Sequence, residues 1–184
     1  MLLKLRESLL EEALGKIAKA KHKGNGNRME KYIENLNKAA TMLQTADHML
    51  YMTYPLIREK RLLLKILNET YLVVLNVVNS ILQYEYVHKR INLYKSAREN
   101  FSVFKNKCAE RYSITPEQVQ QVGLIFELAE KHKNSPFEFV RNNKVVIMTN
   151  ALKTDTITVE KMKEFIILSK DILRKAETII RSRK

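Results

Sequence analysis

The stretch LLLKILNETYLVVLNVVNSILQ, residues 62–83, decides the fold. Apolar residues occupy nearly every side of a helix drawn through it, and a helix that is apolar all round is a central, buried one. Asn68, Asn76 and Asn79 interrupt the apolar run, and buried amides need hydrogen-bond partners. We expect these amides to bond to neighbouring helices and fix their pairing, in preference to a catalytic role. The whole helix is expected from about Leu56 to Arg90.

Further helices are expected on both sides of this one, because apolar residues recur there at helical spacing. Thr115-Pro116-Glu117-Gln118 is a capping box with proline at the first helical position, which marks a helix start. Gly24-Asn25-Gly26-Asn27 is typical of a helix break and predicts a hinge. The remaining helices are expected at residues 2–22, 28–54, 97–112, 116–133 and from about 158 to the C-terminus.

A different pattern precedes the last helix. Residues 144–149 and 155–158 are rich in β-branched side chains and are separated by a polar turn, which predicts a β-hairpin packed on the bundle. Ser135-Pro136-Phe137-Glu138 has the form of a second capping box and predicts a short helical turn. The expected fold is an all-α, up-down bundle of about five to six helices with a small β-hairpin before the C-terminal helix. We expect an amphipathic N-terminal helix with its hinge at 1–27 and the bundle domain at 28–184.

The charge balance narrows the class of partner. The chain has 33 Lys and Arg against 20 Asp and Glu, a formal net charge of +13 and a pI near 9.8. A domain this basic attracts polyanions: RNA and DNA first, then anionic membranes and acidic proteins. The single cysteine, Cys108, allows no internal disulfide and is expected to be a buried, inert thiol. We expect a cytoplasmic protein, because no secretory signal and no run long enough to span a bilayer is visible.

Known catalytic patterns do not appear in the sequence. Gly24 and Gly26 lack the Gly-Lys-Ser/Thr that would follow in a phosphate loop, and no Ser or Cys lies in a nucleophile elbow. Glu85-Tyr86-Val87-His88 has the Glu-x-x-His spacing of di-iron bundles, but such a site needs two of these motifs and two more glutamates. We therefore expect no metal, no cofactor and no catalytic residues.

Cations interleaved with aromatic residues between Tyr84 and Tyr112 give the best functional candidate. Cations neutralise phosphates, and aromatic faces stack on unpaired bases. The alternative is that the aromatic residues point inward and the cations only solvate the surface. The aromatic residues in question are Tyr84, Tyr86, Tyr94, Phe101, Phe104 and Tyr112. The predicted nucleic-acid contacts are Lys89, Arg90, Arg98, Lys105 and Lys107, with Arg141 and Lys144 as secondary contacts. If folding brings the two groups together, a basic groove results.

Residues 28–184 resemble the HEPN superfamily of helical bundles in their central pair of long helices, basic connector and C-terminal helix. These bundles are often dimeric and occur in prokaryotic toxin–antitoxin, defence and RNA-processing systems. Active members cleave RNA with an Arg followed, after four to six residues, by His. None of the four histidines here has an Arg at that spacing; after Arg98 the matching positions are Val103, Phe104 and Lys105. The resemblance therefore implies a non-cleaving member that binds RNA or another protein.

Three functional hypotheses remain open from the sequence. The leading one is a non-catalytic basic module that binds nucleic acid, RNA in preference to DNA. The alternative is a protein-interaction or oligomerisation module, for example a toxin–antitoxin or defence component, in which helix 2–22 docks on a partner or on a second copy to form a homodimer. The third is an RNA-cleaving enzyme whose acid–base pair is not recognisable in the sequence.

Overall fold

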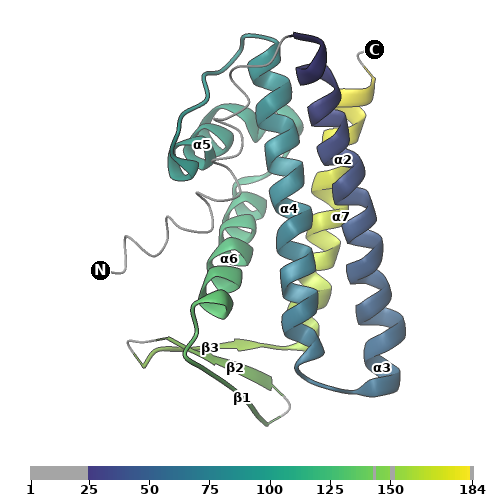
Figure 1. Cartoon of the computed structure of the whole chain (residues 1–184), viewed down its shortest axis with the longest axis vertical. Helices are drawn as coiled ribbons and strands as arrows, with labels where there is room; N and C mark the ends of the chain where they lie inside the picture. Colours follow the sequence, from purple (N-terminus) through teal and green to yellow (C-terminus); the bar gives the residue numbers. More distant parts are fainter. Residues whose placement is uncertain (1–24, 143, 150–151, 183–184) are drawn as a thin grey trace.

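The computed structural model describes residues 25–142, 144–149 and 152–182, and the fold is mostly helical with one small antiparallel sheet. Helices α2 (Asn25–His48), α4 (Leu62–Val87) and α7 (Val159–Arg181) run along the long axis, and α6 (Pro116–Lys133) lies across the other side of α4 (Figure 1). Helix α5 (Ala97–Val103) covers one end of the bundle, and the sheet closes the other (Figure 1).

Helix α4 is the central element, as its apolar sequence predicts. Eighteen of its 26 residues are buried, in contact with α2, α6 and α7. Contrary to the expectation that no run is long enough, α4 has the length and apolarity of a membrane span, and 67% of its most apolar window is buried inside the bundle. An α-helix rises about 1.5 Å per residue, so α4 separates the two ends of the molecule by roughly 39 Å.

Of the three asparagines of this helix, Asn76 bonds to a neighbouring helix as predicted, whereas no such bond is seen for Asn68 or Asn79 among the described residues. Asn68 is exposed. Asn76 donates to the Leu72 carbonyl of its own helix at 2.7 Å, and its contact with α2 is a weak one to the Met42 sulfur at 3.6 Å. Asn79 is buried, yet its side-chain oxygen has no hydrogen-bond partner among the described residues. The three amides differ in burial and in hydrogen bonding because they lie at different positions along and around the helix, which the residue type alone does not reveal.

Both helix boundaries predicted around α2 are wrong in detail. Residues 25–27, predicted as part of a hinge, form the first turn of α2; glycine in a helix costs only about 1 kcal/mol, which tertiary packing of a long helix readily offsets. Helix 2–22 and Gly24 lie outside the described residues. At the other end, the boundary predicted at Pro55, between the helices 28–54 and 56–90, is not found there. Pro55 occupies the first turn of α3 (Tyr54–Ile57), where proline is tolerated, after the π-helical turn Met49–Thr53.

The chain turns sharply at Arg58, which adopts a left-handed backbone conformation with φ 54°, and α4 begins four residues later. The predicted helix from Leu56 to Arg90 is therefore shorter at both ends. The predicted helix 97–112 is divided into α5, the π-helical turn η3 (Phe104–Cys108) and the 3₁₀ turn η4 (Glu110–Tyr112). The capping box at Thr115 is confirmed: its hydroxyl accepts from the Gln118 backbone N–H, and the Gln118 side-chain oxygen accepts from the Thr115 backbone N–H.

The predicted hairpin is a three-stranded antiparallel meander, so the fold is not purely all-α. Strands β1 (Phe137–Arg141), β2 (Lys144–Met148) and β3 (Thr154–Ile157) pair in the order β1-β2-β3. The prediction of a helical turn after Ser135 is wrong, because residues 137–141 form β1. The Ser135 hydroxyl bonds to the Phe137 and Met148 carbonyls instead of capping a helix. Pairing with the strongly β-forming β2 overrides the local capping signal.

Candidate nucleic-acid interface

A buried carboxylate organises the end of the bundle where the chain leaves α4. The Glu85 side chain is fully buried. It accepts hydrogen bonds from Arg90 Nη1 at 3.2 Å, from the Tyr112 hydroxyl at 3.0 Å and from Arg111 Nη1. A buried carboxylate is tolerated only when it is paired and hydrogen-bonded, so these three groups meet its requirement. They also tie the loop after α4 and the turn η4 to the end of α4.

The groups packed around Glu85 show how closed this cluster is. Burial, with a smaller contribution from the Glu85 charge, raises the pKa of the Cys108 thiol to about 12. Burial and Glu85 likewise raise the pKa of Tyr112 far above its usual value. Cys108 is thus the buried thiol that the sequence predicts, and a thiol held in its protonated form is a poor nucleophile.

The loop between α4 and α5 is held by side chains that point inward. Lys89 adopts a left-handed conformation with φ 57°, which turns the chain out of α4, and Ile91 and Leu93 are buried. The fully buried side chain of Asn100 accepts from the Tyr94 backbone N–H at 2.9 Å and donates to the Tyr94 carbonyl at 3.0 Å. This reciprocal pair fixes the backbone at Tyr94 as an adjacent strand would.

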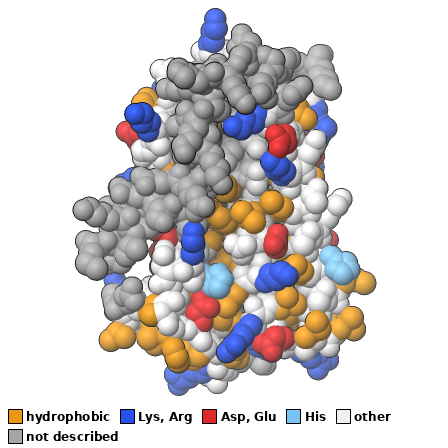
Figure 2. Space-filling model, viewed as in Figure 1, with side chains coloured by type: hydrophobic (Ala, Val, Ile, Leu, Met, Phe, Trp, Pro, Cys, Tyr) orange, Lys and Arg blue, Asp and Glu red, His pale blue; other side chains and the backbone are white. Residues whose placement is uncertain are grey.

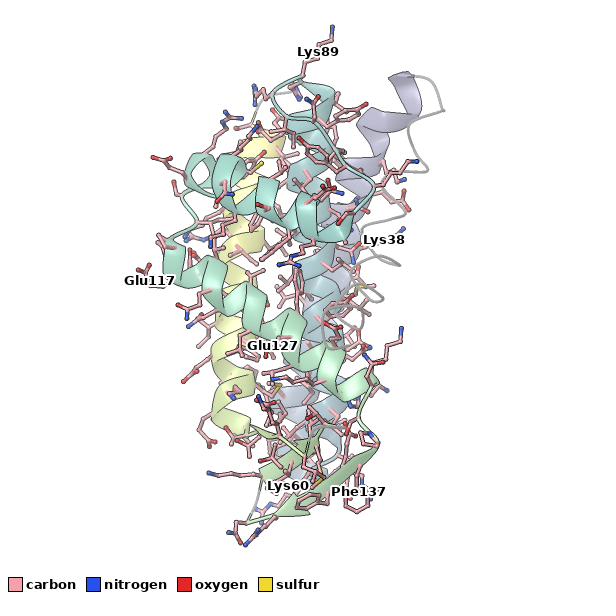
Figure 3. All side chains as sticks on the ribbon, turned by 90° about the vertical axis from the view of Figure 1, so that its left-hand side faces the viewer. Lys38, Lys60, Lys89, Glu117, Glu127 and Phe137 are labelled. Carbon is pink, nitrogen blue, oxygen red and sulfur yellow. The ribbon has the colours of Figure 1, made fainter. Side chains whose placement is uncertain are left out.

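Cations remain exposed on this fixed framework. We define the α5 end as residues 88–113. Exposed cations without a carboxylate partner in the described chain are Lys89, Lys95, Arg98, Lys105 and Lys107. Two exposed acids, Glu99 and Glu110, lie in the same segment. Figure 3 shows Lys89 extending from this end into solvent. Arg90, a predicted phosphate contact, is instead bound to Glu85 and lies over the Tyr84 ring at 5.9 Å.

A groove runs beside these cations, between the π-helical turn η3 and the start of α6. Its volume is about 920 Å³, and Phe101, Lys105 and Asn106 form one wall. Gly123 lies on the α6 side, where a methyl group in place of its hydrogen would meet nothing within 4 Å. The groove therefore has open space next to one of the predicted phosphate contacts.

Most of the aromatic residues between Tyr84 and Tyr112 point into the core, as the alternative interpretation of the sequence predicted. Tyr84, Phe104 and Tyr112 are buried, and Tyr86 and Phe101 pack partly buried against the core. Tyr94 is the exception, because 43% of it is exposed. The predicted helices end near Arg90 and begin again at Ala97, so the sequence already placed Tyr94 in a connector, but nothing in it distinguished Tyr94 from the other five aromatic residues.

The two predicted basic groups do not converge. Arg141 and Lys144 flank the β1–β2 turn at the opposite end of α4 from α5 (Figure 1). The condition for one continuous basic groove is therefore not met, because α4 separates the two groups. Near the sheet, Lys131 pairs with Glu127 and Asp155, and His132 with Glu138 at 2.6 Å.

Sequence reasoning missed two residues that shape the α5 end. Glu85 was considered only as a metal ligand, yet two guanidiniums and a phenol occupy its oxygens, and His88 is exposed with Nδ1 bonded to the Tyr84 carbonyl. Across the described ranges, no cluster of three or more His, Cys, Asp or Glu could hold a metal ion. Asn100 carried no signal, because its partners are backbone atoms of a loop.

Comparison with known proteins finds no matching family model, no related curated protein and no solved structure of similar fold. The function must therefore be argued from the geometry of the chain itself.

Proposed function

We propose that the protein is a non-catalytic module that binds single-stranded nucleic acid, RNA in preference to DNA, through the α5 end. The observation that carries the proposal is the group of exposed cations there without carboxylate partners, Lys89, Lys95, Arg98, Lys105 and Lys107. On α2 and α7, by contrast, Lys38 pairs with Glu34 and Lys170 with Asp47. A cation without an internal partner is available to phosphate.

Tyr94 supports a single-stranded ligand. Its exposed ring lies beside Lys95 in the chain, and the Asn100 amide fixes its backbone. An aromatic face stacks on an unpaired base of any sequence, whereas bases inside a duplex are not open to stacking. Because the loop is already ordered, little entropy is lost when the base stacks.

The backbone that carries these cations is held in place by contacts inside the protein, so little conformational entropy of the backbone is lost on binding. Glu85 joins the loop, through Arg90, to η4, through Arg111 and Tyr112. Lys105 and Lys107 follow directly from α5 on the π-helical turn and are exposed. Phosphate contacts of this kind position a nucleic-acid strand without reading its bases. We therefore expect the protein to bind single strands without a strong sequence preference.

The test is the salt dependence of binding to a fluorescent single-stranded RNA, followed by anisotropy. Each phosphate contact contributes about 0.7 to the slope of log K against log salt for a single strand, so Lys105→Gln with Lys107→Gln should lower the slope by roughly 1.4. The matched control, Arg141→Gln with Lys144→Gln, removes the same charge from the other end and should leave the slope nearly unchanged. Binding that is equal at low and high salt would refute the proposal.

A second comparison separates stacking from charge. Tyr94→Ala should weaken RNA binding by about 1–3 kcal/mol, whereas Tyr94→Phe should retain most of the affinity because the ring remains. Duplex RNA of the same sequence should show no difference between the two variants. Single-stranded DNA tests whether the 2′-hydroxyl contributes.

We also propose that the protein is a HEPN-like bundle that does not cleave RNA. The pairing of α2 with α4 and the C-terminal helix α7 support it, and the missing Arg–His spacing supports a member without RNA cleavage. Incubation of the protein with structured RNA should leave the RNA intact. Cleavage that disappears in His88→Ala would instead support the enzymatic alternative.

A further inference from the structure

Large aliphatic side chains protrude at the opposite end of the bundle. We define the sheet end as residues 51–61, the three strands with their turns, and the first turn of α7. Leu56 and Ile57 on α3 are 85% and 62% exposed, and Leu152 beside β3 is 79% exposed. Phe137 and Val140 on the edge strand β1 are exposed as well. Figure 2 shows hydrophobic side chains with Lys and Arg among them along this lower end. Single exposed apolar residues are ordinary, whereas adjacent ones that protrude together mark an interaction surface, and Leu56 and Ile57 are such a pair.

A basic pocket lies next to the protruding pair. Arg58, Lys60 and Lys163 line a hollow of about 640 Å³ between α3 and the first turn of α7, together with apolar and aromatic side chains of residues 50–55. Lys60 Nζ donates to the buried Tyr54 hydroxyl at 2.6 Å, which holds this ammonium at the pocket wall. Glu160 is the acid of the lining. Three cations against one carboxylate leave an excess of positive charge for an anion.

The combination favours an anionic bilayer as the occupant. Nucleic acid offers phosphates but no apolar phase for protruding aliphatic chains. An ordinary protein interface buries about 800 Å² on each partner around a closely packed centre. Protruding side chains on the turn at a bundle's end present no such centre. An anionic bilayer satisfies both features, because aliphatic side chains enter the acyl boundary while nearby cations meet lipid phosphates.

We propose that the sheet end docks on anionic phospholipid membranes, with Leu56 and Ile57 inserted at the acyl boundary and a headgroup phosphate held among Arg58, Lys60 and Lys163. Arg61, Arg141, Lys144 and Lys153 are further exposed cations of the sheet end. Figure 3 shows Lys60 and Phe137 at this end and Lys89 at the other. The α5 end therefore faces away from the membrane when the sheet end is bound.

The absence of tryptophan from the chain allows a direct test. Leu56→Trp introduces the sole tryptophan at the proposed insertion point. Ile167→Trp introduces it at a matched exposed position, 61% exposed, on α7. With vesicles of equal parts phosphatidylcholine and phosphatidylserine, the emission of Leu56→Trp should move to shorter wavelength and be quenched by brominated acyl chains. Ile167→Trp should show neither effect.

The charge part is tested by co-sedimentation with the same vesicles. Each cation near an anionic surface contributes about fivefold in affinity, so Arg58→Gln with Lys163→Gln should weaken binding roughly 30-fold. Lys105→Gln with Lys107→Gln removes the same charge at the α5 end and should reduce vesicle binding far less. The RNA assay is unaffected by Leu56→Trp if the two ends act separately, so the two proposals fail independently.

Three outcomes would overturn the proposal. Co-sedimentation with an unshifted Leu56→Trp emission would mean that the chain adheres through its general positive charge. An equal shift with pure phosphatidylcholine would mean apolar adhesion without headgroup recognition. A shift that grows with protein concentration in the absence of lipid would mean that the sheet end contacts a second copy of the chain.

Discussion

The two ends of the bundle are both basic, but they differ in what accompanies the charge. At the α5 end, exposed cations stand beside one exposed aromatic ring, and the aliphatic residues Ile91 and Leu93 are buried. At the sheet end, exposed cations stand beside protruding aliphatic chains such as Leu56. A net charge of +13 is compatible with either ligand. The neighbours of the charge distinguish a surface suited to nucleic acid from one suited to lipid.

The ends also differ in the polar contacts that fasten them to the long helices, α4 for the α5 end and α6 for the sheet. The α5 end is joined by the fully buried Glu85 and its three donors. The sheet is joined to α6 by pairs such as Lys131 with Asp155, whose side chains are both partly exposed. Buried pairs are costly to break, whereas exposed ones contribute little. We therefore expect the α5 end to be the more rigid, which the following variants test from the largest effect to the smallest.

Glu85→Gln should have the largest effect, about 3 kcal/mol of unfolding free energy by urea titration. This loss is small for a broken buried ion pair, because Arg90 and Arg111 are partly exposed and water can solvate their charges once Glu85 is neutral. Cys108 gives a local readout: with its pKa raised to about 12, the native thiol should label slowly near neutral pH and faster in the variant. Glu99→Gln, an exposed change on α5, is the control. Equal stability of the two variants would contradict a stabilising role for the buried Glu85 ion pairs.

Asn100→Ala should cost about 1–3 kcal/mol, because the Tyr94 N–H and carbonyl lose their partner. The effect on RNA binding should exceed the effect of the control Asn68→Ala, which removes an exposed asparagine from α4 outside the α5 end. Anisotropy at a temperature where both variants are folded measures this. If Asn100→Ala binds RNA like the parent, the fixed position of Tyr94 is not important for binding.

Lys131→Gln should cost less than about 1 kcal/mol, the usual contribution of a partly exposed pair. Hydrogen exchange should show faster opening of β3 and little change at α5. A loss as large as that of Glu85→Gln would remove the proposed difference between the ends.

Asp171 lies between the ends and gives the smallest, pH-dependent effect. Hydrogen bonds from Lys175, Arg174 and Gln118 hold its pKa well below its usual range. A lowered carboxyl pKa stabilises the fold above the usual value near 3.8, and this contribution disappears as the pH falls through the lowered pKa. Asp171→Asn should therefore be slightly less stable than the parent at pH 6, by under about 1 kcal/mol, with the gap closing in strong acid. A gap that widens in acid would contradict the assignment.

The sequence predicted what depends on local pattern and missed what depends on pairing across the chain. The central helix followed from its uniform apolarity, and the Thr115 cap from its local motif. Strand β1 was missed because the Ser135-Pro136 pattern was interpreted as a helix cap, although Phe137, Phe139 and Val140 favour a strand and pair with β2. Glu85 was misjudged since Arg111, which binds it, lies 26 residues away. The separation of the basic groups follows from the direction of α4, which no composition reveals.

Hydrogen exchange of the full chain with each ligand tests most directly whether the two ends bind different ligands. With single-stranded RNA, we predict protection in peptides covering residues 88–113 and none in residues 51–61. With phosphatidylserine-containing vesicles, we predict protection at 51–61 and none at 88–113. Protection of the same segment by both ligands would show one general cationic surface and would contradict the account of two ends with separate tasks.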